Sequence, residues 1–115
     1  MSTTKILPTD SFLRELKKLS KRHISIKDDM AKLIADLRRN PFQGIGIGHG
    51  MRKMRLPISS KGRGKSGGAR VISHVTIVAE VDGAIVRLLK IYDKSERETI
   101  SDTELHELLR KNGLL

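Results

Sequence analysis

The sequence predicts one α+β domain in which a helical hairpin packs on one face of a small, mostly antiparallel sheet. Two adjacent segments in the first third of the chain repeat apolar residues at helical spacing, and later segments are rich in β-branched residues. The predicted order of elements is β-α-α-β-β-β-α, which is typical of an α+β protein. A length of 115 residues with 37% hydrophobic content suits a single domain, residues 1–115.

The first segments predict a short strand and a helix. Residues 5–7 form the strand, which ends at Pro8. Residues 10–22 form the helix, and the apolar residues that share one face at i, i+3, i+4 and i+7 spacing are Phe12, Leu13, Leu16 and Leu19. The residues that can cap this helix are Thr9, Asp10 and Ser11.

A second helix follows after a short connection, so the two helices should form an antiparallel hairpin. Ser25 and Asp28 resemble a capping box with Asp in place of Glu. Residues 26–37 then keep helical period until Asn40-Pro41 ends the helix. The apolar faces of both helices must be buried, and a sheet is the surface on which we expect them to pack.

The next segments predict a strand between two irregular connections. Residues 42–50 are rich in glycine and too irregular for a helix. Residues 51–56 alternate as a strand, which puts Lys53 and Arg55 on one face. Residues 57–68 then form a polar loop that contains several glycines.

The last segments predict a hairpin and a short helix. Residues 69–81 are rich in β-branched residues, and residues 84–92 return as the partner strand. Asp82-Gly83 would join the two strands, because glycine readily supplies the positive φ of a type I′ turn. The final helix starts at the capping box of residues 101–104 and ends at Gly113.

Nearly all of the net positive charge lies in one third of the chain. Residues 37–79 contain nine Lys/Arg and no acidic residue, whereas the rest of the chain holds fourteen Lys/Arg against thirteen acidic residues. The formal net charge of the whole chain is +10. A charge concentrated in this way predicts a surface that binds a polyanion. The alternative is a basic loop that only meets solvent.

The composition excludes several kinds of site. The chain has no cysteine, so it has neither disulfides nor thiolate metal sites. Only two Phe, one Tyr and no Trp argue against a surface that stacks on bases, so nucleic-acid binding should work through phosphates. No apolar run approaches the roughly 20 residues that span a bilayer, and the N-terminus lacks a secretory signal. We therefore expect a cytosolic protein without a membrane partner.

Two glycine-rich segments do not match the motifs of nucleotide-binding loops. The segment GRGKSGG lacks the first glycine of a P-loop, because Ser59 stands at that position, and a strand follows it. Residues 44–50 miss the G-x-G-x-x-G pattern in every register. The histidines also show no paired ligand spacing, and Asp28 and Asp29 suit the dipole at the start of a helix. We expect neither a metal nor a cofactor.

Strand geometry would gather cationic side chains on one concave surface. Residues two or four positions apart on a strand share a face. If the strands pair, that surface holds Lys53 and Arg55, Arg70 and His74, and Tyr92 with Lys94, beneath a loop that carries Lys61, Arg63 and Lys65. Arginine can hold two phosphate oxygens and lysine acts as a point charge, so the surface suits a bent phosphodiester backbone.

Three segments resemble a known family. The run GRGKSGGARVI, the preceding strand ending in KMRL, and YDKSE near the C-terminus are similar to the HigB/RelE-type toxins of type II toxin–antitoxin modules, the RelE superfamily of mRNA interferases. The similarity covers nearly the whole chain and includes the order of elements. It implies a RelE-like, microbial-ribonuclease-like fold. It also implies a ribosome-dependent endoribonuclease that cleaves translated mRNA, inhibits protein synthesis and is silenced by a cognate antitoxin.

The resemblance also implies roles for individual residues. The residues that it makes catalytic are Lys53, Arg55, Arg70, Tyr92 and Lys94. We assign RNA binding to Lys61, Arg63, Lys65 and His74. The chain departs from the family where Ser73-His74 replace aromatic residues that often follow ARVI, and where Asp93 stands between Tyr92 and Lys94.

Metal-independent RNA cleavage would use the 2′-OH of the RNA as nucleophile. The enzyme must then help to remove a proton, stabilise charge on the phosphate and protonate the leaving oxygen. Arg70 is the candidate for charge stabilisation, while Lys53 and Arg55 would orient the phosphate. The base and the acid stay open among Lys53, Tyr92 and His74. His74 is alternatively an interior histidine, and Tyr92 a residue that packs at the strand end.

Two other functions stay open from the sequence. One is a non-catalytic protein that binds RNA or the ribosome with the same surface. The other is a ParE-like toxin, which shares the fold but poisons DNA gyrase. The partners that we expect are mRNA on the ribosome, rRNA and an acidic antitoxin protein, because the net charge of +10 attracts polyanions and acidic partners.

Overall fold

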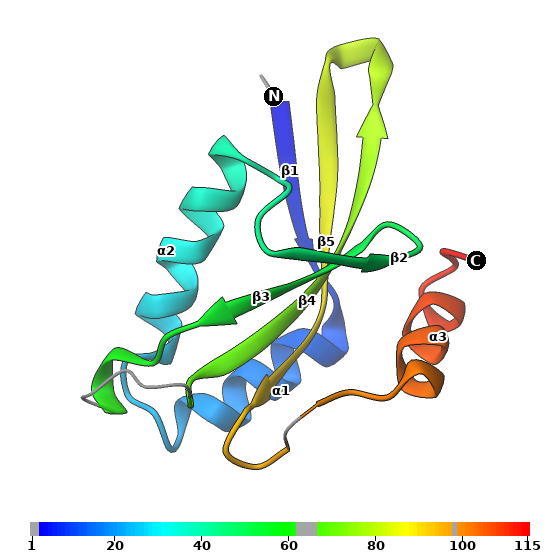
Figure 1. Cartoon of the computed structure of the whole chain (residues 1–115). Helices are drawn as coiled ribbons and strands as arrows, with labels where there is room; N and C mark the ends of the chain where they lie inside the picture. Colours follow the sequence, from blue (N-terminus) through cyan, green and yellow to red (C-terminus); the bar gives the residue numbers. More distant parts are fainter. Residues whose placement is uncertain (1–2, 62–66, 98) are drawn as a thin grey trace.

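A computed structural model describes residues 3–61, 67–97 and 99–115 of the chain. The helices and strands follow each other in an α+β order (Figure 1): β1 (Thr3–Pro8), α1 (Asp10–Ser20), α2 (Ile26–Arg39), β2 (Ile45–Gly48), β3 (Met51–Leu56), β4 (Ala69–Val78), β5 (Gly83–Asp93) and α3 (Asp102–Lys111). Two short 3₁₀ turns, η1 (Ser59–Lys61) and η2 (Ala79–Val81), lie in the connections. Within the described part of the chain, no helix has the length and apolar character needed to cross a bilayer.

The five strands form one sheet in the order β1-β5-β4-β3-β2. Only β1 runs parallel to its neighbour, while the other three pairs are antiparallel. The predicted α+β class, with a mostly antiparallel sheet, is therefore confirmed. The parallel pair joins the first strand to the last strand of the chain, because Thr3 lies opposite Gly83 and Pro8 opposite Leu88.

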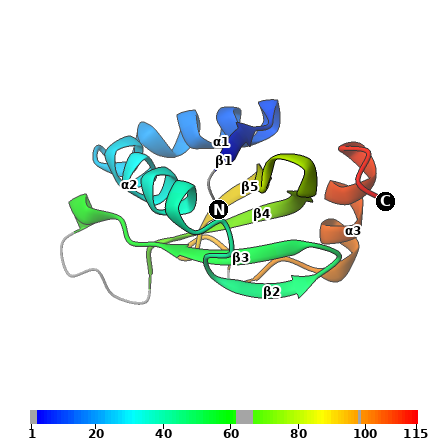
Figure 2. The same cartoon turned by 90° about the horizontal axis from the view of Figure 1, so that it is seen from above.

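Helices cover both faces of this sheet. Seen from above, α1 and α2 lie together over one face, as the predicted helical hairpin should (Figure 2). Their apolar residues share a core with Met54 and Leu56 of β3. On the other face, Leu108 and Leu109 of α3 pack with Ile72 of β4 and with other buried residues. The sheet therefore has an α1–α2 face and an α3 face.

One strand of the sheet was not predicted. Residues 45–48 form β2 at the sheet edge, where the sequence predicted an irregular connection. Glycine alternates with isoleucine there, so the strand shows little β-propensity. Gly44 lets the chain enter β2 with φ +85°, and a Cβ atom at this position would lie 2.3 Å from the carbonyl oxygen of Lys53. The edge strand thus depends on the absence of a side chain next to β3.

The hairpin of β4 and β5 turns differently from the prediction. β4 ends at Val78, and η2 occupies the last residues of the predicted strand. Asp82, and not Gly83, adopts the left-handed conformation, with φ +49°. Gly83 already pairs with Val78, and a Cβ atom on it would lie 2.4 Å from the carbonyl oxygen of Thr3. Gly83 is therefore needed for the approach of β1 and not for the turn.

The helix caps agree with the predictions in two of three cases. The Thr9 hydroxyl accepts a hydrogen bond from the Phe12 amide, and the Ser101 hydroxyl accepts one from the Glu104 amide. Ser25 does not cap α2, because its backbone is already helical. Its hydroxyl donates instead to the Asp29 carboxylate at 2.8 Å. The predicted capping box with Asp28 is therefore wrong.

Candidate functional site

A row of side chains crosses three strands on the α3 face of the sheet. Arg55 of β3 lies opposite Arg70 of β4, and Arg70 lies opposite Tyr92 of β5. Directly opposed residues of antiparallel strands point to the same face. Lys53 is opposite Ile72, which packs with α3, so Lys53 shares that face as well. The sheet thus brings together four of the predicted catalytic residues, and we call Lys53, Arg55, Arg70 and Tyr92 the cross-strand row.

The row is graded in exposure from the sheet edge inward. Arg55 is exposed and Lys53 is half-buried, whereas only 6% of Arg70 is accessible. The guanidinium of Arg70 donates from Nη1 to the carbonyl oxygens of Gly67 at 3.2 Å and Ala69 at 3.1 Å. These bonds orient Arg70 at the base of the loop that connects β3 to β4. Arg70 is therefore held in place by its own strand and loop, whereas Arg55 is the exposed cation of the row.

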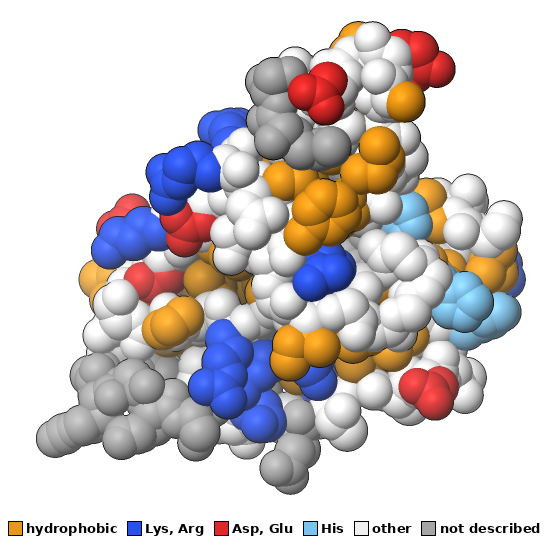
Figure 3. All heavy atoms as spheres, turned by 45° about the horizontal axis from the view of Figure 1, so that its top comes forward, with side chains coloured by type: hydrophobic (Ala, Val, Ile, Leu, Met, Phe, Trp, Pro, Cys, Tyr) orange, Lys and Arg blue, Asp and Glu red, His pale blue; other side chains and the backbone are white. Residues whose placement is uncertain are grey.

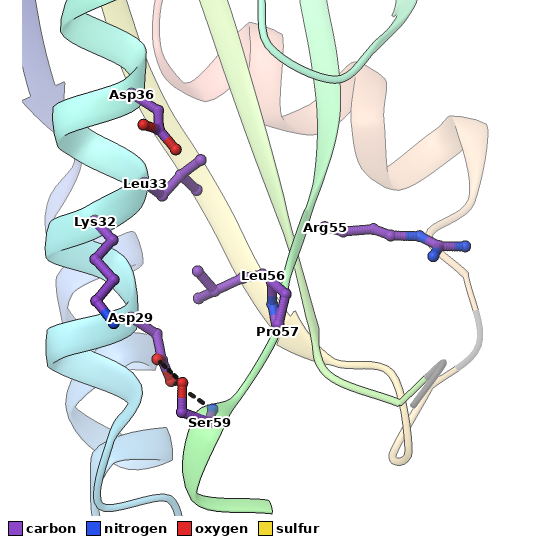
Figure 4. A pocket seen from close by; sticks show the side chains of 8 residues that line it. All are labelled: Asp29, Lys32, Leu33, Asp36, Arg55, Leu56, Pro57 and Ser59. Atoms are coloured by element: carbon purple, nitrogen blue, oxygen red, sulfur yellow. Dashed lines mark hydrogen bonds between the residues drawn. The ribbon is translucent and has the colours of Figure 1, made fainter. Parts of the chain in front are cut away.

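The molecular surface shows how cations gather. On the face seen in Figure 3, one group of Lys and Arg side chains lies close together with apolar side chains beside it. A cavity of about 270 Å³ lies between α2 and β3. Leu33 and Asp29 of α2 point into it, whereas Arg55 points away from α2 (Figure 4). The cavity thus belongs to the α1–α2 face, and the Arg55 guanidinium serves the other face.

Tyr92 lies at the buried end of the cross-strand row. Only 5% of the residue is accessible, and its hydroxyl has no hydrogen-bond partner among the described residues. Burial raises the pKa of the Tyr92 hydroxyl above its usual value, although the Arg70 and Arg97 guanidiniums oppose this shift. The phenol therefore keeps its proton at neutral pH. It can donate a proton to a leaving oxygen but is poorly suited to remove one.

Arg97 covers the Tyr92 ring. Its guanidinium carbon lies 5.3 Å from the ring centroid, within the range of a cation–π contact. The same guanidinium binds both carboxylate oxygens of Glu104 on α3, at 2.5 and 3.2 Å. These hydrogen bonds hold the pKa of Glu104 below its usual range, despite partial burial. Arg97 therefore links α3 to the end of β5 across the tyrosine.

Lys90 extends this ionic network to α1. Its ammonium lies 2.5 Å from Glu15 of α1 and 3.6 Å from Glu104 of α3. Both Lys90 and Arg97 thus meet the same carboxylate at the start of α3. The network holds the first turn of α3 next to β5. It does so beyond Leu88, where β5 no longer has β1 as a neighbour.

Lys94 and Asp93, at the end of β5, contact different parts of the molecule. The Lys94 amide donates to the Gly68 carbonyl at 3.0 Å, so the backbone after β5 reaches the base of the β3–β4 connection. Asp93 instead contacts His23, with 2.8 Å between Oδ2 and Nε2. The acidic residue that interrupts the tyrosine–lysine pair therefore contacts the connection between the two helices of the hairpin.

His74 lies away from the other predicted site residues. It shares the α3 face but is four residues from Arg70, or about 13 Å along the strand. Its ring packs against Gly50, where a Cβ atom would lie 2.9 Å from Nε2. Burial lowers the pKa of His74 below its usual value, and the Arg87 guanidinium lowers it further. His74 is thus neutral at pH 7, and its assignment to RNA binding stays a prediction.

The loop residues assigned to RNA binding are largely outside the described residues. Arg63 and Lys65 lie in the gap between residues 61 and 67. For Lys61 only the backbone is described, at the end of η1. Their roles stay predictions. Within the described ranges, no three His, Asp or Glu side chains gather in a way that could hold a metal ion.

Comparison with known proteins identifies the fold. No protein-family model matches the chain, and no curated protein sequence matches it. Among solved structures, the chain is similar to a double arginine-to-alanine mutant of the E. coli toxin RelE in the free state. The TM-score is 0.56 at 15% sequence identity, over 85% of this chain and 90% of that chain. The chain has the RelE fold.

The RelE fold confirms the fold that the sequence resemblance implied. The likeness to HigB toxins in particular stays a prediction, as do the roles of single residues. The contact of His23 was missed because its partner, Asp93, lies 70 positions away in the sequence. The contacts of Arg97 with Tyr92 and Glu104 are closer in the sequence, but they depend on the turn after β5, which no motif marked. One signal was present: in a strand, Asp93 must face away from Tyr92.

Proposed function

We propose that this protein is the toxin of a toxin–antitoxin pair and cleaves translated mRNA on the ribosome without a metal ion. The RelE fold supports the proposal at the level of the protein class. The observation that carries it is the cross-strand row, in which Arg55 and Arg70 stand directly opposite each other. Two guanidiniums on the same face of the sheet can together bind the oxygens of one phosphodiester.

The row suits cleavage in which the RNA 2′-OH attacks the adjacent phosphorus. The P–O5′ bond then breaks, and the products are a 2′,3′-cyclic phosphate and a free 5′-hydroxyl. Arg70 stabilises the extra negative charge on the phosphoryl oxygens, because its orientation is set before the substrate arrives. Lys53 and Arg55 hold the flanking phosphates from the more exposed side.

The two proton transfers have unequal candidates. Tyr92 carries its proton at neutral pH, so it is the candidate acid for the leaving 5′-oxygen. Its hydroxyl is buried, so a rearrangement has to expose it before it can reach RNA. Lys53 is then the candidate for the base. His74 is too far along β4 from Arg70 to act on the same phosphate.

Partners follow from the same surface. The cationic row and the β3–β4 connection would bind mRNA and rRNA phosphates on the ribosome. An acidic antitoxin that lies over the row would compete with RNA for these cations. The burial of Arg70 and Tyr92 supports one other candidate function, an RNA-binding protein without catalysis. Groups that are buried in this way need a rearrangement before they touch substrate.

Induction of the protein in bacterial cells tests the proposal. Wild type should arrest growth and cut transcripts within translated codons, as mapped by primer extension. Arg70→Ala should lower the cleavage rate by about 10²–10³, the usual cost of one lost charge-stabilising donor. Arg70→Lys keeps the charge without the planar fork, and it should retain an intermediate rate.

The controls separate catalysis from folding and from other functions. Arg70 is buried, so each variant is first checked by thermal unfolding; Arg55→Gln, at an exposed position, provides a second loss of charge with little effect on folding. Intact transcripts with wild-type protein would reject the nuclease in favour of RNA binding. Growth arrest with broken or over-supercoiled DNA and intact mRNA would indicate a gyrase poison instead.

A further inference from the structure

The connection between α1 and α2 holds both sides of the cross-strand row. On one side, the Ser60 amide donates to the Ser25 hydroxyl at 2.8 Å, next to the base of the β3–β4 connection. On the other side, His23 contacts Asp93 at the end of β5. Two consecutive parts of one short connection thus reach the β3–β4 connection and the end of β5, which lie on either side of the start of β4.

The His23–Asp93 contact is buried. The His23 side chain is 13% accessible and that of Asp93 is 2% accessible. A carboxylate can only accept hydrogen bonds, so Nε2 of His23 donates to Oδ2 of Asp93 at 2.8 Å. The other carboxylate oxygen accepts from the amide and the hydroxyl of Ser95, at 2.9 and 2.7 Å. A buried carboxylate needs such donors, because burial without them is costly.

Asp93 also organises the turn that follows β5. Its backbone carbonyl accepts from the amides of Glu96 at 3.0 Å and Arg97 at 3.1 Å. Side chain and main chain of one residue therefore shape the whole segment from Asp93 to Arg97. This segment places Arg97 over the Tyr92 ring and brings the Lys94 amide to Gly68.

The neighbours of Asp93 are both site residues. Tyr92 precedes it on β5, and strand alternation turns Tyr92 to the opposite face from the Asp93 side chain. Lys94 follows in the turn, with its amide bonded to the Gly68 carbonyl. The torsion of the chain at Asp93 therefore bears on the positions of both residues. A displacement of about 1 Å in a catalytic group lowers the rate by roughly 100-fold, so an anchor at this point has a large effect on chemistry.

We propose that His23 and Asp93 are a positioning pair, which sets Tyr92 and Lys94 for RNA cleavage from the other side of the sheet. The inference rests on the proposed nuclease function and deepens it. Neither residue touches RNA. His23 supplies a donor to the buried Asp93 carboxylate, and the carboxylate fixes the turn. Without that donor the turn relaxes, and Tyr92 and Lys94 lose their places beside Arg70.

A set of three variants tests the pair. His23→Leu removes the donor and keeps an apolar side chain in the buried site. His23→Gln restores an N–H donor near the position of Nε2. Arg22→Ala is the matched control at the adjacent residue, where it breaks an ion pair with Glu96 whose partners are both about half accessible. Thermal unfolding of each purified protein sets a temperature at which all variants are folded.

Cleavage of a single mRNA in a purified translation system supplies the kinetic readout. His23→Leu should lower kcat by about 10- to 100-fold and leave KM within about twofold, because the groups that act in the transition state move while the exposed cations still bind. His23→Gln should recover most of kcat, and Arg22→Ala should match wild type. A folded His23→Leu protein with wild-type kcat overturns the proposal, and so does an equal loss in the Arg22→Ala protein.

A second readout does not depend on cleavage. Tyr92 is the only tyrosine and the chain has no tryptophan, so ultraviolet titration reports this residue alone. In His23→Leu the Tyr92 hydroxyl should become more accessible, and its pKa should fall toward the usual value; in Arg22→Ala it should not change. If wild type cleaves no RNA but Tyr92 responds in this way, the nuclease proposal fails and the positioning by His23 stands. An unchanged Tyr92 titration in His23→Leu overturns the positioning.

Discussion

Asp29 shows how a single side chain joins a helix to the loop that borders the site. Its carboxylate accepts from the amide and the hydroxyl of Ser59, at 3.0 and 2.6 Å, and from the hydroxyl of Ser25. Burial raises the pKa of this carboxyl, but the hydrogen bonds from the two serines and the nearby Lys32 ammonium outweigh it. The pKa of Asp29 therefore lies below its usual value.

We predict that Asp29→Asn lowers the free energy of unfolding by about 1–3 kcal/mol at pH 7, because hydrogen bonds to a charged acceptor are lost. The carboxylate form is favoured in the folded state, so its stabilisation is present above the unfolded pKa of about 4 and is lost as the pH falls through the folded pKa. The difference between wild type and variant should therefore shrink below about pH 4. Urea unfolding at pH 7 and pH 3 measures it.

The neighbouring Asp28 is the control for this substitution. Asp28 is exposed at the start of the same helix, so Asp28→Asn should change stability by less than about 0.5 kcal/mol. Equal losses in the two variants would show that charge at the helix start matters, and not the serine contacts. The sequence marked both aspartates as partners of the helix dipole. It could not separate them, because Ser59 lies thirty positions away from Asp29.

Elements were predictable where local chemistry decides them. Thr9 and Ser101 cap their helices because a hydroxyl just before the first turn accepts a hydrogen bond from an amide that has no partner within the helix. β2 was not predictable, because Ile45 and Ile47 alternate with glycines and the strand exists only through its pairing with β3. The cross-strand row lies between these cases. The alternation of residues along each strand predicted which side chains share a face of the sheet. The register that sets Arg55 opposite Arg70 could be read only from the structure.

Gly83 gives a test at the scale of strands. A Cβ atom there would meet the backbone of Thr3 at 2.4 Å, so β1 has to move if a side chain is added. We predict that Gly83→Ala lowers the free energy of unfolding by about 1–3 kcal/mol, as other overpacked sites do. Hydrogen exchange should show faster opening of β1 than of β3, because only the parallel pair is displaced.

Gly46 of β2 is the matched control. An added Cβ atom there would meet only the end of the flexible Arg52 side chain, at 3.3 Å. Gly46→Ala should therefore be neutral or slightly stabilising, since alanine reduces the freedom of the unfolded chain. If Gly83→Ala is as stable as Gly46→Ala, the contact between β1 and β5 tolerates a methyl group and the role assigned to Gly83 is wrong.

The positive charge is distributed unevenly over the molecule, and the salt dependence of RNA binding tests whether this distribution matters. The affinity for a single-stranded RNA oligonucleotide should fall steeply as salt rises, because bound phosphates release counterions. Lys53→Gln should reduce the slope of log affinity against log salt by about 0.7, the value for one phosphate contact on a single strand. Fluorescence anisotropy at several salt concentrations measures the slopes.

Lys27 serves as the control cation. It is exposed on α2, on the other face of the sheet from the cross-strand row. Lys27→Gln removes the same charge from the molecule and should leave the slope unchanged. If both variants reduce the slope equally, RNA responds to the net charge of +10 and not to a localised surface.

The parallel pair of β1 and β5 has a consequence for how the protein is made. β1 leaves the ribosome first, yet its neighbour in the sheet is the last strand to be synthesised. The α1–α2 hairpin therefore emerges before the strands that bury its apolar side, and it must wait for them. The same order applies to the cross-strand row, because Tyr92 is synthesised after Lys53, Arg55 and Arg70. We expect nascent chains that stall before β5 to be inactive in the proposed cleavage, because they lack Tyr92.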